Sequence, residues 1–214
     1  MGSQSKAIKI AEEVFREIKL LPGMTEKDVA RSIRQKLKQK GAQREAFRLI
    51  VASGIRSVNP HAFATNKRLR AGEIVKVDMG ALYKGYRSDI TRTYFLGKPT
   101  TKQRKIYRLV LKAQLAAIRK VKAGVLARAV DRAARSVIER AGFGKNFIHS
   151  TGHGIGRQVH EPPRISRKSE EKLKAGQVIT IEPGIYIRGW GGVRIEDMVR
   201  VTRGGCRILT RVPK

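Results

Sequence analysis

The sequence has few of the features that mark secreted, membrane-spanning or lipid-anchored proteins. Its 214 residues include one cysteine, Cys206, which excludes an internal disulfide framework and fits a reducing compartment. No apolar stretch approaches the roughly 20 residues that a membrane-spanning helix needs. The N-terminus MGSQSKAIKI lacks the apolar core of a signal peptide, and Lys6 stands where a myristoylation signal has Ser or Thr. We therefore expect a globular protein of the cytoplasm.

Acidic residues are also scarce, since 17 Asp and Glu stand against 47 Lys and Arg, a formal net charge of +30. The basic residues are spread along the chain, and the hydrophobic fraction of 41% is ordinary for a globular protein. Aromatic residues make up only 6%, and no zinc-finger spacing, aromatic RNA-binding motif or helix-turn-helix pattern accompanies the charge. The charge alone indicates non-specific affinity for polyanions and defines no fold.

Hydrophobic spacing predicts helices that alternate with groups of strands. Helices are expected over 5–20, from the Thr25–Asp28 capping box to Gly41, after Thr100, and over about 126–141; strands are expected over 47–53 and 73–79, as a hairpin over 81–97, and as short runs between glycine turns over 176–210.

The chain contains an internal echo. Segments 22–41 and 123–142 are equally long, lie 101 residues apart, and share Gly, Val, Arg, Arg and Gly at matching places. Each segment follows a long amphipathic pattern and precedes a β pattern. We therefore expect two similar α+β halves around a pseudo-twofold axis, with a shared site between them.

Two pairs of carboxylates flank turns. The positions of Asp78 and Asp89 centre one turn on Tyr83-Lys84, so we expect the two side chains to face each other across a hairpin. Glu182 and Glu196 repeat the arrangement around Gly189. Carboxylates so close repel each other unless a shared proton or a divalent cation intervenes.

Histidines complete this set. The glycine-rich stretch TGHGIGRQVHE supplies His153 and His160. Four carboxylates and one imidazole form an oxygen-rich donor set that suits Mn, Co or Fe better than a thiolate zinc site does. Four negative charges also balance two divalent ions. His149 is expected to be a buried hydrogen-bonding residue, and Tyr186 a packing residue.

Long motifs carry a family resemblance. FRLIVASG, NPHAF, VKVDMGALYKGYRSDITRTYFLG, STGHGIGRQVHEPP and VITIEPGIYIRGWGGVRIEDMVRVT resemble the pita-bread metallopeptidases of family M24, which include methionine aminopeptidase, Xaa-Pro aminopeptidase, prolidase and creatinase. The resemblance covers nearly the whole chain. It implies an α+β pita-bread fold with two pseudo-symmetric halves around a curved antiparallel sheet.

The resemblance also implies residue roles. Two divalent ions (Mn, Co, Fe or Zn) would be held by Asp78, Asp89, His153, Glu182 and Glu196, of which Asp89 and Glu196 bridge the two ions. His61 and His160 would bind substrate and help to move protons, and Glu182 would carry a proton to the leaving amine.

The residues of two motifs distinguish subgroups of this family. SDITRT and GGVRIED resemble the Xaa-Pro enzymes, in which Arg194 would hold the carboxylate cluster in place. We expect an exopeptidase acting at Xaa-Pro bonds, with methionine aminopeptidase-like activity as the alternative. The sequence predicts a single catalytic domain over 1–214, without the additional N-terminal domain of those enzymes.

A different class of function stays open. Some pita-bread proteins have lost their metal site and bind nucleic acid or ribosomes, and the charge of +30 makes that class attractive. All five ligands are present here, which favours the enzyme. We expect a peptide substrate, non-specific nucleic acid or another polyanion as a further partner, no membrane, and a monomer or homodimer.

Overall fold

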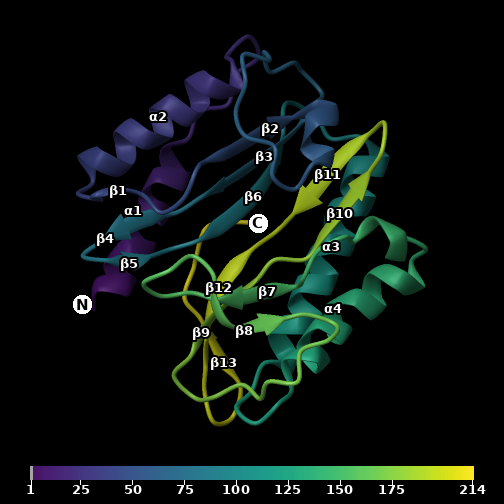
Figure 1. Ribbon diagram of the computed structural model, residues 1–214. Helices are drawn as coiled ribbons and strands as arrows, with labels where there is room; N and C mark the ends of the chain where they lie inside the picture. The colour runs from purple at the N-terminus through teal and green to yellow at the C-terminus, as the bar shows by residue number, and fades with distance from the viewer. Residues whose placement is uncertain (1) are drawn as a thin grey trace.

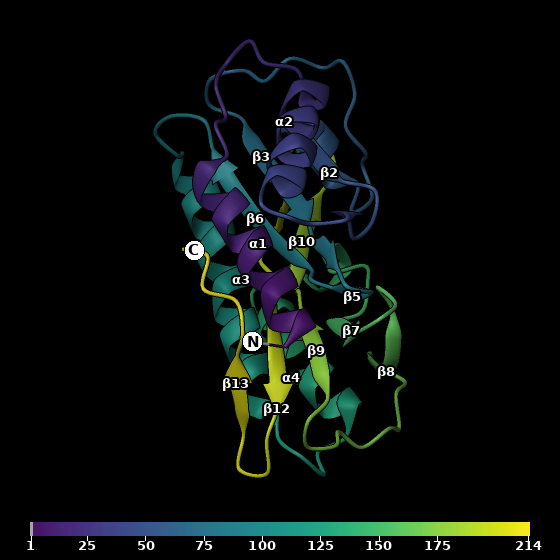
Figure 2. The same ribbon diagram turned by 90° about the vertical axis from the view of Figure 1, so that its left-hand side faces the viewer.

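Four helices cover the outside of a curved set of antiparallel strands (Figure 1). The computed structural model describes residues 2–214. Helices α1 and α2 cover strands of the first half of the chain, and Figure 2 views the molecule from their side. Helices α3 and α4 pack on strands of the second half. No helix within residues 2–214 is both long and apolar enough to cross a membrane.

The first half combines two helices with two small sheets, ordered β2-β3-β6 and β1-β4-β5. Its elements are α1 (Ser3–Glu17), α2 (Glu26–Gln39), β1 (Arg44–Glu45), β2 (Ile50–Ser53), the 3-10 helix η1 (Gly54–Val58), β3 (Ile74–Met79), β4 (Ala81–Tyr83), β5 (Tyr86–Arg87) and β6 (Ile90–Phe95). The strand expected over 47–53 thus begins at Ile50.

The second half repeats this plan with a five-stranded sheet, ordered β13-β12-β9-β7-β8, and the β10-β11 hairpin. Its elements are α3 (Thr101–Lys120), α4 (Ala127–Arg140), the 3-10 helix η2 (Gly144–Asn146), β7 (Gly152–Gly154), β8 (Glu161–Ile165), β9 (Val178–Ile181), β10 (Gly184–Ile187), β11 (Gly191–Arg194), β12 (Asp197–Val201) and β13 (Cys206–Ile208).

Side-chain caps begin two of the helices. The predicted capping box of α2 is present, because Thr25 accepts from the Asp28 backbone N–H while the Asp28 carboxylate accepts from that of Thr25. Thr100 and Gln103 form the same reciprocal pair at the start of α3. Each box satisfies two backbone donors that a helix start otherwise leaves unpaired, so the local sequence determines where these helices begin.

The two halves repeat each other in backbone detail, as the internal echo predicts. The Gly23 N–H donates to the Leu69 carbonyl, and 101 residues later the Gly124 N–H donates to the Leu173 carbonyl. Both glycines have left-handed φ, +92° and +83°. The short sequence echo therefore marks a true structural repeat.

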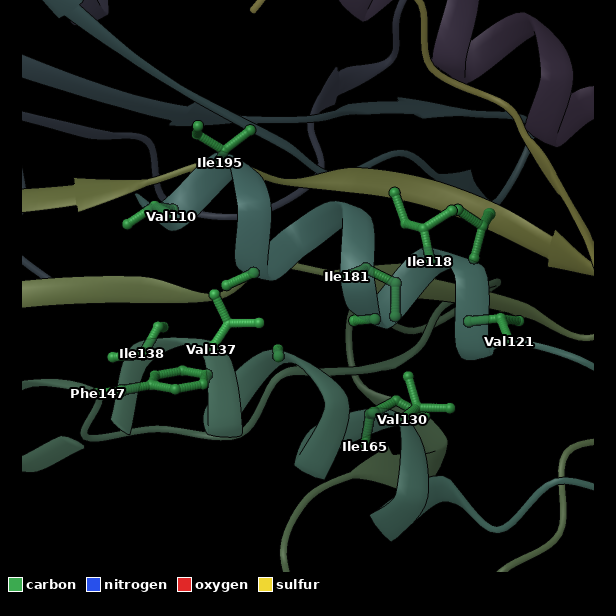
Figure 3. Packing of buried hydrophobic residues seen from close by; sticks show 14 of the residues in the cluster. Val110, Ile118, Val121, Val130, Val137, Ile138, Phe147, Ile165, Ile181 and Ile195 are labelled. Carbon is green, nitrogen blue, oxygen red and sulfur yellow. The ribbon is translucent and has the colours of Figure 1, made fainter. Parts of the chain in front are cut away.

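Each half has its own hydrophobic core. In the second half, Val110 and Ile118 of α3 and Val137 of α4 belong to one buried cluster with Ile181 and Ile195 (Figure 3). A separate cluster joins α1 and α2 to β3 and β6. Burying each such aliphatic side chain contributes about 1.5–3 kcal/mol, so the helices hold the strand ends between the halves in place.

Candidate metal centre

The five predicted ligands come together from both halves of the chain. Asp78 lies on β3 and Asp89 directly precedes β6, whereas His153 lies on β7, Glu182 directly follows β9, and Glu196 lies between β11 and β12. All five line one cavity of about 840 Å³. Glu182 is partly exposed, and the other four are buried.

The expectation that Asp78 and Asp89 lie directly opposite each other is wrong, because the strands pair in a different register. Asp78 pairs with Thr91, because the turn lies one residue later than expected, at Lys84-Gly85. Both turn residues have left-handed φ, 45° and 78°, the two-residue turn that matches the twist of flanking strands. The partner therefore shifts by two residues. Since side chains alternate along a strand, this shift leaves the two aspartates on one face as diagonal neighbours.

The expected register of Glu182 and Glu196 is confirmed. In the β10–β11 hairpin Gly184 lies opposite Arg194, which sets the same register that the two glutamates require. Pro183, which has no N–H to donate, follows Glu182 and separates β9 from β10. The two carboxylates thus lie where the ladder is interrupted.

Glycines on either side of His153 allow two backbones to approach closely. A Cβ on Gly152 would lie 1.9 Å from the Thr180 carbonyl oxygen, and one on Gly154 would lie 2.2 Å from that of Pro162. Neither position has room for a side chain. The run Gly-His-Gly therefore packs β7 tightly against its neighbours and leaves the imidazole as the one side chain that projects from the strand.

The ring of His153 is oriented as a metal ligand would be. Its Nδ1 donates to the Gly154 carbonyl at 3.0 Å, so Nε2 faces Glu182 at 3.3 Å and Asp89 at 3.7 Å. Burial lowers the pKa of His153, but the Glu182 carboxylate outweighs it and raises that pKa. Burial conversely raises the pKa of Glu182, and His153 outweighs it, bringing the pKa to about 2. An imidazole that donates one N–H to a carbonyl presents its other nitrogen to a metal.

Arg194 lies among the carboxylates. Its guanidinium forms a buried ion pair with Asp78, and its Nε donates to the Thr91 hydroxyl at 3.1 Å. Thr91 in turn donates to Glu196 at 2.7 Å. The same Nε lies 3.9 Å from Glu182. One buried cation thus links carboxylates from both halves, yet a single positive charge cannot balance four negative ones.

Unpartnered oxygens show that this donor set fits divalent metal ions. Ligand atoms of Asp89, His153 and Glu196 lie within 4.8 Å of one another. Asp78 Oδ1 and Glu196 Oε1 are buried without any hydrogen-bond partner. Burial and the charge of Glu196 raise the pKa of Asp89 well above its usual range, and burial and Glu182 do the same to the pKa of Glu196. Buried carboxylate oxygens that accept no hydrogen bond suit hard divalent cations.

Two more predicted histidines lie on the wall of the cavity. The rings of His160 and His153 are 4.4 Å apart between centroids, at 75° to each other. Burial and the charge of His153 lower the pKa of His160. His61 follows η1 in a loop whose Asn59 side chain accepts from the His61 N–H at 2.9 Å. Both imidazoles are solvent-exposed and line the cavity, where a ligand can reach them.

The sequence did not predict a polar chain behind the site. His149 Nδ1 donates to the Ser150 carbonyl at 2.8 Å, so its Nε2 accepts from the Tyr186 hydroxyl, also at 2.8 Å. Arg194 donates to that hydroxyl at 3.0 Å. Burial lowers the pKa of His149 to about 4, which keeps the ring neutral. His149 is hydrogen-bonded as expected, but Tyr186 does more than pack. Tyr186 lies four residues after Glu182, and side chains four residues apart in a strand point to the same face. This spacing was the signal in the sequence that could have placed Tyr186 beside the site.

Comparisons with known proteins agree with this geometry. The chain is 47% identical over 211 residues to the Xaa-Pro dipeptidase of Pyrococcus furiosus, a match that covers 98% of this chain and 61% of that protein. The structure of the prolidase from Pyrococcus furiosus superposes with a TM-score of 0.97 at 46% identity, over 99% of this chain and 64% of that one.

A bacterial structure gives the same result. The Xaa-Pro dipeptidase from Bacillus anthracis superposes with a TM-score of 0.98 at 43% identity, over 99% of this chain and 60% of that one. The chain thus spans about 60% of the length of the curated relatives it matches, and the expected pita-bread fold is confirmed. The model of metallopeptidase family M24 matches residues 3–203, and the chain belongs to that family.

Proposed function

We propose that this chain is the catalytic part of a metal-dependent exopeptidase that removes the first residue of a peptide at an Xaa-Pro bond. The observation that carries the proposal is the single cavity in which buried carboxylates and one imidazole converge, with two carboxylate oxygens lacking any donor. Relatives named Xaa-Pro dipeptidase support proline as the residue after the scissile bond.

We propose that two divalent ions would be held by Asp78, Asp89, His153, Glu182 and Glu196. Mn, Co, Fe and Zn all suit this donor set. Once bound, such ions supply Lewis acidity toward the scissile carbonyl and lower the pKa of a water.

The chain's own groups bind and orient the peptide. Its N-terminal amine would bind beside the metal ligands, which sets the register of an exopeptidase. His153 lowers the pKa of Glu182 to about 2, so this carboxylate is ionised at neutral pH. Because it lies in the cavity and has no proton of its own, it is the group we propose to carry a proton from the attacking water to the leaving amine. His160, with its lowered pKa, is neutral and can donate a hydrogen bond to the developing oxyanion. His61 contacts the substrate, and Arg194 keeps Asp78 in place.

The experiment that tests this proposal is the release of the N-terminal residue from a small peptide panel. Protein stripped with a chelator is reloaded with Mn, Co, Fe or Zn and given Ala-Pro, Ala-Pro-Ala and Met-Ala-Ser. Cleavage before proline that disappears in Asp89→Ala is the expected result. Cleavage of Met-Ala-Ser alone would instead assign methionine aminopeptidase-like activity. A folded protein that turns over no peptide with any metal would refute the enzyme.

A second candidate function is polyanion binding by α3. This 20-residue helix carries seven Lys and Arg and no acidic residue. On α2, in contrast, Arg34 pairs with Glu45 and Lys36 pairs with Glu17, as does Lys40 directly after the helix. We propose non-specific nucleic-acid affinity that falls steeply with salt, and a dissociation constant insensitive to salt would exclude it. We also propose that the protein is cytoplasmic. We propose a monomer or homodimer, and measurement of its size in solution tests this oligomeric state.

A further inference from the structure

A second groove opens beside the catalytic cavity. It has a volume of about 550 Å³ and lies between the segment that follows α4 and the end of β8. His149, Ser150 and Arg164 line both hollows. The groove and the cavity are therefore neighbouring hollows that share part of their walls.

The groove is strongly basic. Its lining includes five cationic side chains and no Asp or Glu: Arg135, Lys145, Arg164, Arg167 and Lys168. Arg135 is neutralised by a buried ion pair with Asp131, and Arg167 contacts Glu139. Lys145, Arg164 and Lys168 are exposed and form no ion pair among residues 2–214. Ile148, which is 62% exposed, adds an apolar surface in the same groove.

The position of the basic groove next to the cavity sets a direction for a bound peptide. The proposed metal ligands lie in the cavity, where the N-terminal amine of a substrate binds. Arg164, which is exposed, lines both the cavity and the basic groove. An extended peptide advances about 3.3 Å per residue, so its third and later residues come to lie beyond the scissile bond and toward the groove.

We propose that this groove binds the residues that follow proline in substrates longer than a dipeptide, and that it selects peptides carrying Asp or Glu there. The proposal rests on the proposed function, which it extends to a substrate class. Lys145 and Lys168 attract the acidic side chains of the peptide, and Ile148 packs against their aliphatic parts.

Matched peptides test this selection. Ala-Pro-Glu-Glu-Ala-amide and Ala-Pro-Gln-Gln-Ala-amide differ only in two charges. The kcat/KM ratio of the acidic to the neutral peptide is expected to be roughly five- to tenfold, as two or three exposed ion pairs would give. In the double variant Lys145→Gln/Lys168→Gln the ratio falls toward one. Lys19→Gln/Lys38→Gln, which removes the same charge from the exposed surface of the first half, retains it.

The outcomes separate the two proposals. If neither these peptides nor Ala-Pro is cleaved, the proposed function fails, and the groove is judged by fluorescence anisotropy of the labelled acidic peptide with protein in chelator. If Ala-Pro alone is cleaved, the proposed function stands and the groove proposal is overturned. Binding that the double variant weakens and the control retains supports the groove. Equal kcat/KM values, or equal binding by both variants, overturn it. An RNA oligonucleotide that displaces the peptide equally well from wild type and double variant would also overturn it, because the general basic surface would then be responsible.

Discussion

Acidification is expected to destabilise this protein in part through His149. Burial holds the pKa of this residue at about 4, against an ordinary value of 6.5. Between these two values the unfolded chain takes up a proton that the folded state does not. Stability therefore falls as the pH drops through 6.5 toward 4, and is unaffected by this group above 6.5. The difference of about 2.5 pH units corresponds to about 3 kcal/mol, most of it reached by pH 4.5.

Urea unfolding at pH 7.5 and 4.5, followed by circular dichroism in chelator, measures this contribution. In His149→Gln the amide can still accept from Tyr186, so we expect a loss of about 1 kcal/mol at pH 7.5. At pH 4.5 the variant should be more stable than the wild type by about 1–2 kcal/mol, because it has no imidazole to protonate. His61→Gln, at an exposed imidazole, serves as the control and should follow the wild type. If His149→Gln shows the same pH dependence as the wild type, the reasoning is refuted.

Three further predictions concern the site. Asp89→Asn should lower kcat/KM at least about a hundredfold and abolish the rise in Tm that Mn produces, which calorimetry with and without the ion measures; an undiminished rise would exclude Asp89 as a ligand. Arg194→Gln should weaken metal affinity about 10- to 100-fold, because it frees the Asp78 side chain from its ion pair. Calorimetric titration with the metal measures this affinity, and an unchanged value would contradict the prediction. Gly152→Ala should cost about 3 kcal/mol of unfolding free energy, because its Cβ meets a carbonyl oxygen at 1.9 Å, whereas Gly204→Ala has open space and should cost far less; equal denaturant midpoints would contradict this.

Local rules accounted for most of the helices. Thr25 and Thr100 begin α2 and α3 because the reciprocal hydrogen bond lies three residues away, within the reach of sequence reasoning. The register of the first hairpin was missed, although its signal was present. Lys84-Gly85 is the pair that can take left-handed φ at both positions, and placing the turn one residue earlier shifted Asp78 onto the wrong partner.

The chain by itself determined the donor types, their order and the twofold repeat of the fold. Only the tertiary structure decided how these donors meet. Arg194 binds Asp78, 116 residues away, and Thr91 binds Glu196, 105 residues away, because two separately packed halves bring their strand ends together. The basic groove arises in the same way, from a loop after α4 and the end of β8. Hydrophobic periodicity predicts which face of an element is buried, but contacts between distant elements depend on how whole layers pack, which no local pattern encodes.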